Sequence, residues 1–202
     1  MAITAGGNDI DRATEIIVLA FASDPVWGVA TARPDGSTAH HAALWRPYVE
    51  GAMRHSGVYL NEERTAVSVW IPPGCDEMSE AHQSKVLSVV EASLPAASVV
   101  AMLELWERFA EAQPRGGEHA YLSFLATHPD NRGAGVGQNL LRENLEMFDR
   151  QGVPTYLEST NPGNNHRYER AGFATIGQFE SIFNAAPISR MWRPVGGNPN
   201  SD

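Results

Sequence analysis

The chain has 202 residues, and its 15 Lys and Arg against 24 Asp and Glu give a formal net charge of −9. Hydrophobic residues make up 43% and charged residues 19% of the chain, which excludes a mainly disordered protein. The acidic balance disfavours bare nucleic acid or an anionic membrane as a partner. A small cationic partner is the better candidate, although an acidic surface more often serves only solubility.

Cysteine and apolar residues limit the class of protein further. Cys75 is the single cysteine, so an intramolecular disulfide and a cysteine-rich zinc cluster are excluded. The adjacent His40 and His41 have no third ligand at metal spacing, and we expect no bound metal. The chain shows neither a signal-peptide pattern nor a run of 18 apolar residues, which predicts a cytoplasmic protein without a membrane span.

The first half of the chain alternates helical and extended patterns. Apolar residues at helical spacing predict helices over 10–21, over 38–55 with a break or restart at Pro47, and two within 76–112 separated near Pro95. Two short strands joined by a charged turn are predicted over 58–60 and 66–71. In the second helix of 76–112, we expect Leu103, Trp106 and Ala110 to face inward.

The second half predicts a strand–helix–strand unit followed by a short helix and two strands. The predicted segments are a strand over 120–126, a helix containing Leu140, Leu141, Leu145 and Phe148, a strand over 155–160, a helix over 164–170, and strands over 174–183 and 188–193. No repeat or long linker divides the chain. We therefore expect one domain over 1–195 and a disordered tail over 196–202.

A glycine-rich turn joins the strand over 120–126 to the following helix. Gly133, Gly135 and Gly137 let the backbone approach a ligand closely, and the helix N-terminus adds partial positive charge. The turn therefore predicts a pyrophosphate cradle. A Walker A loop is excluded because it needs a lysine and the only lysine is Lys85, and the glycine spacing is not that of a Rossmann fingerprint.

The same turn carries a family motif. Arg132-x-x-Gly135-x-Gly137 resembles the Arg/Gln-x-x-Gly-x-Gly/Ala motif of the GCN5-related N-acetyltransferase (GNAT) superfamily, with a strand before it as that motif expects. A second block ends in Tyr-x-x-x-Gly-Phe over 168–173, with the spacing of the superfamily's later strand and helix. Within the superfamily, the segments 70–74 and 157–162 are similar to the branch that contains puromycin N-acetyltransferase.

The resemblance implies the fold and the cofactor site. The implied fold is an α/β domain whose mixed, mostly antiparallel sheet is flanked by helices, with a splayed strand pair forming a wedge for acetyl-CoA. A homodimer is also implied at the level of the family. The residues that the resemblance assigns to acetyl-CoA are Leu125, Ala126, Thr127, Arg132, Gly133, Ala134, Gly135, Val136, Gly137, Asn161, Asn164 and Arg167. For Arg167, a solvated helix arginine is the favoured alternative.

Two catalytic residues are implied in the same way. Tyr168 matches the tyrosine that protonates the departing thiolate, and a phenol with a pKa of ~10 suits a thiolate of similar basicity. The alternative is a packed tyrosine. Glu158 matches a glutamate that takes a proton from the amine, directly or through water. The alternative is a carboxylate that only pairs with an arginine, since a carboxylate inside a central strand is costly unless paired or functional.

The acceptor site is expected to come from segments 22–55 and 76–112, where the resemblance to the family is weakest. Asp24 and Trp27 follow the first helix, which leads to the acceptor in this superfamily, and Trp70 ends a strand. With Glu158, these are the candidate substrate-binding residues, because an acidic, aromatic-lined pocket suits a cationic amine. Core packing is the favoured alternative for Trp70 and Trp106.

The resemblance implies direct transfer of an acetyl group from acetyl-CoA to a primary amine in a ternary complex. The expected acceptor is a small cationic molecule. The most specific form of this hypothesis is an aminoglycoside or aminonucleoside antibiotic, which would make the protein an antibiotic-resistance enzyme. Two alternatives stay open. One is acetylation of a protein lysine or N-terminus, and the other is a non-catalytic acyl-CoA-binding sensor.

Overall fold

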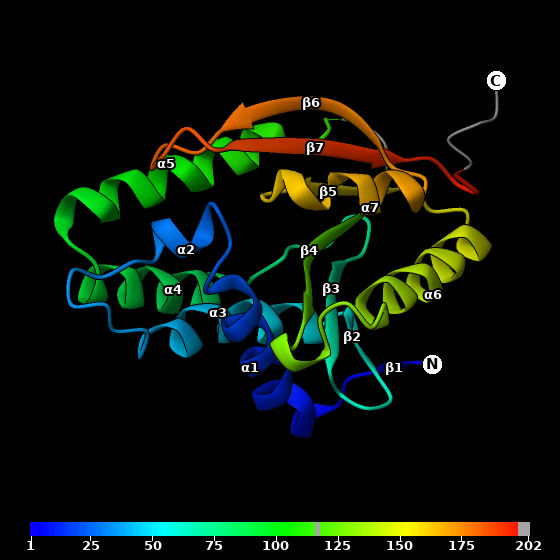
Figure 1. Ribbon diagram of the computed structural model, residues 1–202, viewed down its shortest axis with the longest axis horizontal. Helices are drawn as coiled ribbons and strands as arrows, with labels where there is room; N and C mark the ends of the chain where they lie inside the picture. The colour runs from blue at the N-terminus through cyan, green and yellow to red at the C-terminus, as the bar shows by residue number, and fades with distance from the viewer. Residues whose placement is uncertain (116–117, 198–202) are drawn as a thin grey trace.

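The computed structural model describes residues 1–115 and 118–197, and one seven-stranded sheet organises them in the order β1-β2-β3-β4-β5-β7-β6 (Figure 1). All neighbouring strands are antiparallel except β4 and β5, which are parallel. The strands are β1 (Ala2–Thr4), β2 (Val58–Asn61), β3 (Ala66–Ile71), β4 (Ala120–Thr127), β5 (Thr155–Ser159), β6 (Ala174–Glu180) and β7 (Pro187–Arg193). The predicted mixed, mostly antiparallel sheet is confirmed.

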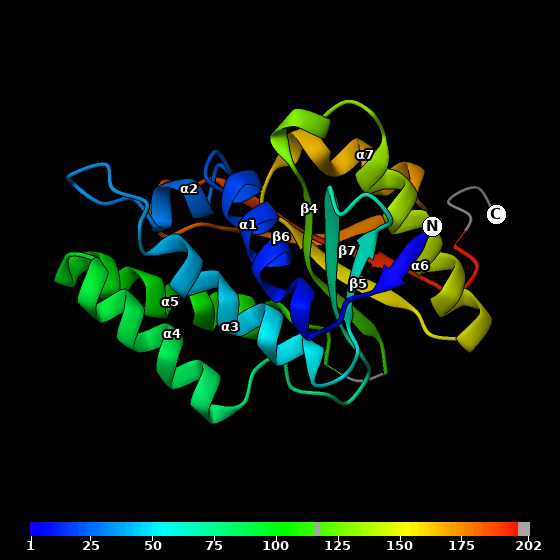
Figure 2. The same cartoon turned by 90° about the horizontal axis from the view of Figure 1, so that it is seen from below.

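Helices cover both faces of the sheet (Figures 1 and 2). They are α1 (Ile10–Phe21), α2 (Trp27–Ala30), α3 (His41–Met53), α4 (Glu80–Ser93), α5 (Ala96–Ala112), α6 (Val136–Gln151) and α7 (Asn165–Arg170). α1 and α3 pack on β3 from one side, α6 packs on it from the other, and α4 and α5 extend the α3 side. None of the helices within the described residues is long and apolar enough to cross a bilayer.

Strand β3 separates two hydrophobic cores, because successive side chains point to opposite faces of a sheet. Val67 and Val69 belong to the core under α1 and α3. Trp70 belongs to the core under α6, with Leu141 and Phe148. The apolar face predicted for α6 is therefore confirmed, and the sheet is buried on both sides over this strand.

The sheet opens between β4 and β5. These two strands are paired only where Ala120–Leu122 face Thr155–Leu157. Beyond Leu122, β3 is the one described strand that stays paired with β4, and the register of this pair shifts at a bulge at Ser123. The splayed strand pair implied by the resemblance is present, and it creates an opening in the middle of the sheet.

Several local predictions need correction. α3 runs without a break through Pro47, although proline removes a helix hydrogen bond, because the surrounding turns are buried by packing. The short elements β1 and α2 carry no periodicity long enough to be seen in the sequence. Of the tail predicted over 196–202, residues 198–202 lie outside the described part of the chain.

Candidate active site

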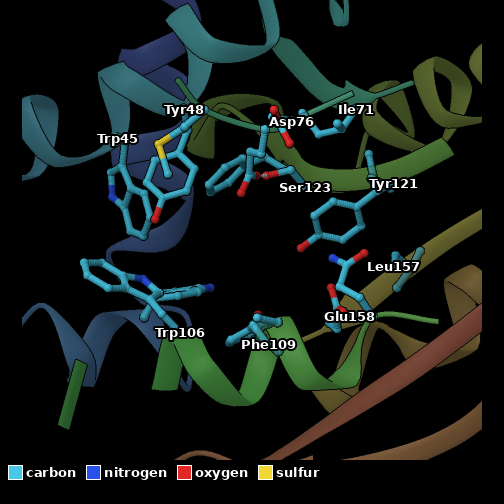
Figure 3. Close-up of a pocket in the computed structure, with 18 of the residues that line it drawn as sticks. Trp45, Tyr48, Ile71, Asp76, Trp106, Phe109, Tyr121, Ser123, Leu157 and Glu158 are labelled. Carbon is cyan, nitrogen blue, oxygen red and sulfur yellow. Dashed lines mark hydrogen bonds between the residues drawn. The ribbon is translucent and has the colours of Figure 1, made fainter. Parts of the chain in front are cut away.

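A cavity of about 1230 Å³ lies at the opening between β4 and β5 (Figure 3). Its wall is formed by the segment from the end of α1 to α2, by α3, by the β3–α4 loop, by α4 and α5, and by β4, β5 and α7. A volume of this size exceeds what a primary amine alone would need, so the cavity has room for the body of an acceptor.

Aromatic side chains form one end of the cavity. Figure 3 shows Trp45 and Tyr48 of α3 on one side and Trp106 and Phe109 of α5 on the other. Trp27 of α2 closes the wall, since its ring stacks on Phe109 at 5.4 Å between centroids and meets Trp45 edge-on at 5.3 Å. Such rings offer an apolar body a surface and a cation the negative face of a π-system.

Helix α5 presents a second apolar face to this cavity. The sequence predicted that Leu103, Trp106 and Ala110 face inward, yet the core positions of α5 are Met102 and Leu105. Leu103, Trp106 and Ala110 line the cavity. Trp106 also packs on the core, as predicted, whereas Leu103 is 42% exposed. Hydrophobic spacing cannot distinguish a face that packs on a core from one that lines a binding cavity.

Glu158 lies on β5 directly after Leu157, the last residue that pairs with β4. Both carboxylate oxygens are buried, and the phenols of Tyr156 and Tyr121 approach them without forming a hydrogen bond of full geometry. Burial raises the pKa of Glu158 to about 7. The charge of Glu77 raises this pKa further, while the phenols of Tyr156 and Tyr121 and the charge of Arg190 lower it. A carboxyl group with this pKa can accept a proton near neutral pH.

The alternative reading of Glu158 was an ion pair with an arginine. Arg190 of β7 is its direct cross-strand neighbour, but no ion pair joins these two side chains in the described part of the chain. The Nε of Arg190 is itself buried without a partner. The Glu158 carboxylate therefore lies at the cavity wall, where the charge of Arg190 lowers its pKa without forming an ion pair.

Tyr168 lies on α7 and lines the same cavity. Its ring packs edge-on against Phe173, with 6.1 Å between centroids. Burial raises the pKa of Tyr168 to about 12, and the charge of Asp24 adds to this effect while Arg167 opposes it. The phenol is therefore protonated at neutral pH, as a proton donor must be.

Asp24 lines the cavity, but its carboxylate is fully engaged. Oδ1 accepts hydrogen bonds from the backbone amides of Val26 at 2.9 Å and Trp27 at 3.0 Å. Oδ2 accepts a hydrogen bond from the hydroxyl of Thr160 at 2.8 Å. Asp24 thus holds the start of α2, including the predicted site residue Trp27, against the end of β5.

The glycine turn forms an open concave surface before α6. Gly133 and Gly135 have φ values of 83° and 75°, and a Cβ added to either would meet nothing within 4 Å. Gly137 differs, because its Cβ would lie 2.5 Å from Oγ1 of Thr127. Glycine at position 137 thus lets the start of α6 lie close to the end of β4, and the open turn before this helix N-terminus fits a pyrophosphate.

The remaining residues of the turn are accessible. Arg132 is exposed and donates a hydrogen bond from Nη2 to the backbone oxygen of Ala20 at 3.2 Å. Ala134 is exposed and Val136 is half-buried. The Arg132 guanidinium therefore lies at the surface beside the cradle, where an anion can reach it.

The other predicted cofactor residues surround the opening. Leu125 lines the cavity, whereas the Ala126 side chain is buried in the core, which leaves only its backbone for a ligand. Asn161 and Asn164 also line the cavity, and their Oδ1 atoms accept hydrogen bonds from Gly163 N and Arg167 Nη1. Arg167 is exposed, as the solvated alternative expects.

Trp70 does not contact the cavity, and its prediction as a substrate-binding residue is wrong. The side chain is fully buried under α6, where it packs on Phe148 at 4.8 Å between ring centroids. Its indole N–H donates to Oδ1 of Asn144 at 3.1 Å. The neighbouring residue Ile71 lines the cavity instead, because adjacent residues of a strand point to opposite faces.

The sequence analysis did not identify four acidic residues that line the cavity, which are Asp76, Glu77, Glu80 and Glu118. Glu77, in the β3–α4 loop, accepts a hydrogen bond from the hydroxyl of Ser123, and Tyr121 lies beside it on β4. The acidic residues that line the cavity are Asp24, Asp76, Glu77, Glu80, Glu118 and Glu158. No Lys or Arg is among the lining residues that the structure describes. The acidic composition was visible in the sequence, but its concentration here was not.

A family model described as the acetyltransferase (GNAT) family matches residues 64–173, which is more than half of the chain. The match runs from just before β3 to the end of the Tyr168 block. It therefore contains both walls of the strand opening, the glycine turn and both predicted catalytic residues.

Solved acetyltransferase structures share the fold over nearly the full chain. A Corynebacterium glutamicum protein described as histone acetyltransferase HPA2 and related acetyltransferase has a TM-score of 0.70 at 24% identity, over 96% of each chain. Arylalkylamine N-acetyltransferase 2 from Aedes aegypti has a TM-score of 0.68 at 13% identity, over 96% of this chain and 98% of that one. A mosquito arylalkylamine N-acetyltransferase like 5b has a TM-score of 0.63 at 17% identity, over 96% and 99%.

At these identities the solved structures establish the shared fold, and the family model establishes the family. The chain belongs to the GNAT family of N-acetyltransferases.

Proposed function

We propose that the protein transfers the acetyl group of acetyl-CoA to a primary amine of a small cationic molecule. The observation that carries this proposal is the buried carboxylate of Glu158, whose pKa is raised to about 7, in an aromatic and acidic cavity at the strand opening. That one sheet includes strands from Ala2 to Arg193 supports a single catalytic domain over 1–195.

Acetyl-CoA would supply the acetyl group as a thioester with a thiolate leaving group. The amides and arginine of the turn from Arg132 to Gly137 would hold its pyrophosphate, because Gly133 and Gly135 leave that surface open. Backbone groups of Leu125–Thr127 pair with no described strand on the β5 side, so they would hold the pantetheine arm and polarise the thioester carbonyl. Asn161 and Asn164 would complete the cofactor site.

Glu158 would take a proton from the acceptor, directly or through a water, so that the neutral amine can attack. Its pKa of about 7 allows the carboxylate to be ionised at neutral pH and still to hold a proton well enough to act as a base. Tyr168 would give its proton to the departing sulfur. A covalent acetyl-enzyme is not required, and transfer is direct.

The chemistry of the cavity wall supports a cationic acceptor with an apolar or aromatic body. Six acidic residues and no described Lys or Arg line it, and five aromatic rings form its far end. The five rings suit the aromatic body of an aminonucleoside, and the acidic residues suit the several amino groups of an aminoglycoside. We propose the puromycin N-acetyltransferase-like branch on the resemblance of segments 70–74 and 157–162 alone.

The test is thiol release from acetyl-CoA across a panel of puromycin, aminoglycosides, simple arylalkylamines, polyamines and short peptides. Turnover of a small cationic amine that is lost in Glu158→Gln supports the proposal. Turnover of peptides alone would favour acetylation of protein lysines or N-termini. Coenzyme A binding without turnover of any amine would favour the sensor alternative.

A further inference from the structure

A second carboxylate stands beside Glu158 at the strand opening. The pairing of β4 with β5 ends at Leu122 and Leu157. The next residues are Ser123 on β4 and Glu158 on β5. The Ser123 hydroxyl donates a hydrogen bond to Oε1 of Glu77. The backbone of β4 and this one hydrogen bond therefore place Glu77 at the same opening, reached from the other strand.

The two carboxylates share an electrostatic environment. The phenol of Tyr121 lies near both, since the charges of Glu158 and Glu77 add to burial in raising its pKa. The side chains come from different segments, β5 and the β3–α4 loop, and both line the cavity. Glu77 and Glu158 thus both line this cavity, and Figure 3 shows Tyr121 beside Glu158.

Neither carboxylate forms an ion pair within the described part of the chain. Glu77 accepts a hydrogen bond from Ser123, and the phenols of Tyr156 and Tyr121 and the charge of Arg190 only partly offset the burial of Glu158. Burial of a charge without a counter-charge is costly, and two neighbouring ones repel each other. A ligand that brings two positive charges would remove both costs.

The other acidic residues of the cavity do not offer the same interaction. The Asp24 carboxylate already accepts three hydrogen bonds. Asp76, Glu80 and Glu118 are exposed, so water and salt screen their charges. Glu77 and Glu158 remain as the pair of enclosed carboxylates.

We propose that Glu77 binds a second cationic group of the acceptor, so that the substrate is a diamine with a short spacer between its two nitrogens. This inference rests on the proposed function, because it assigns the reacting amine to Glu158. The second nitrogen stays protonated as an ammonium ion and forms an ion pair with Glu77. Glu77 is thus a residue that determines specificity, and it takes no part in proton transfer.

Binding tests the inference independently of catalysis. Calorimetry in the presence of coenzyme A compares diamines of three to six carbons with the monoamines of equal length, in which a methyl group replaces the second ammonium. We expect the best diamine to bind the wild-type protein at least about tenfold more tightly than its monoamine. Equal affinity for both at every length would overturn the inference.

Variants assign the preference to Glu77. Glu77→Gln keeps an acceptor for the Ser123 hydroxyl and should reduce the diamine preference to less than about threefold. Glu91→Gln, an exposed residue of α4 outside the cavity wall, removes the same charge and should leave the preference intact. A preference that survives Glu77→Gln unchanged would refute the assignment.

A shorter side chain at position 77 should change the preferred length of the diamine, a change that unfolding of the variant would not produce. Glu77→Asp withdraws the carboxylate by one C–C bond, so the preferred diamine should become longer by about one methylene. An unchanged optimum in a folded Glu77→Asp protein would count against direct contact. Thermal unfolding of each variant shows that the fold is retained.

Thiol-release assays with the same amines separate this inference from the proposed function. If diamine preference in binding depends on Glu77 but no amine is acetylated, the inference stands and the proposed function fails. If monoamines and diamines are acetylated equally well and Glu77→Gln changes neither rate, the function stands and the inference fails.

Discussion

The carboxylate of Asp24 accepts a hydrogen bond of 2.8 Å from the hydroxyl of Thr160, 136 residues further along the chain. This bond joins the aromatic wall of the acceptor cavity to the end of β5, two residues beyond Glu158. The negative charge of Asp24 also raises the pKa of Tyr168. One carboxylate therefore links the position of Trp27 to the protonation of the tyrosine.

Loss of this link should cost stability. Asp24→Ala leaves two backbone amides and one hydroxyl without their acceptor, and we expect unfolding free energy to fall by about 1–3 kcal/mol. Urea unfolding of Asp24→Ala, Thr160→Val and the double variant measures the coupling between them. Additive effects of the two substitutions would show that the bond contributes nothing of its own.

The pH dependence of catalysis should follow Glu158. Since only the ionised carboxylate can accept a proton, kcat/KM should rise with pH through an apparent pKa of about 7. Glu77→Gln removes a negative charge that raises the pKa of Glu158. In this variant, the rise of kcat/KM should therefore occur at lower pH than in the wild type. Glu91→Gln is the matched control. Identical pH profiles in the wild type and both variants would show that the charge of Glu77 does not act on the pKa of Glu158.

The same pKa predicts a pH-dependent cost to stability. Folding raises the pKa of Glu158 from 4.5 to about 7, so the folded state holds a proton that the unfolded state releases, and stability falls as pH rises between these values. Glu158→Gln should therefore stabilise the protein by about 1–3 kcal/mol at pH 8 and by little at pH 4. Melting temperatures at the two pH values test this, and a variant less stable than wild type at pH 8 would refute it.

Bulk at Gly135 should block the cofactor. The residue has φ of 75° and open space where a Cβ would lie, so Gly135→Glu places a bulky anion in the cradle and should abolish coenzyme A binding in calorimetry. Gly135→Ala is the control, because it adds the backbone strain of about 1 kcal/mol without the bulk or charge. Unchanged affinity in Gly135→Glu would remove the pyrophosphate from this turn.

Tyr168 should affect turnover more than binding. Tyr168→Phe keeps the ring on Phe173 and deletes the proton donor, so we expect kcat to fall by about 10²-fold or more with coenzyme A affinity within about threefold of wild type. Parallel losses in kcat and affinity would instead describe a tyrosine whose role is structural.

Local patterns in the sequence determined much of this protein. Glycines at 133 and 135 predicted the cradle because a turn with positive φ is a property of neighbouring residues. Leu141 and Phe148 predicted the buried face of α6 because helical spacing is local as well. The family motif placed Tyr168 and Glu158 for the same reason, since each motif is contained in one short segment.

Only the tertiary structure decided which of these faces meet. Strand register sent Trp70 into the core under α6 and Ile71 to the cavity, a choice that a shift of one residue would reverse. The hydrogen bond from Ser123 to Glu77 joins segments 46 residues apart, and no local pattern encodes it. The acceptor cavity is built from such long-range contacts, because each wall comes from a different element and packing alone brings them together.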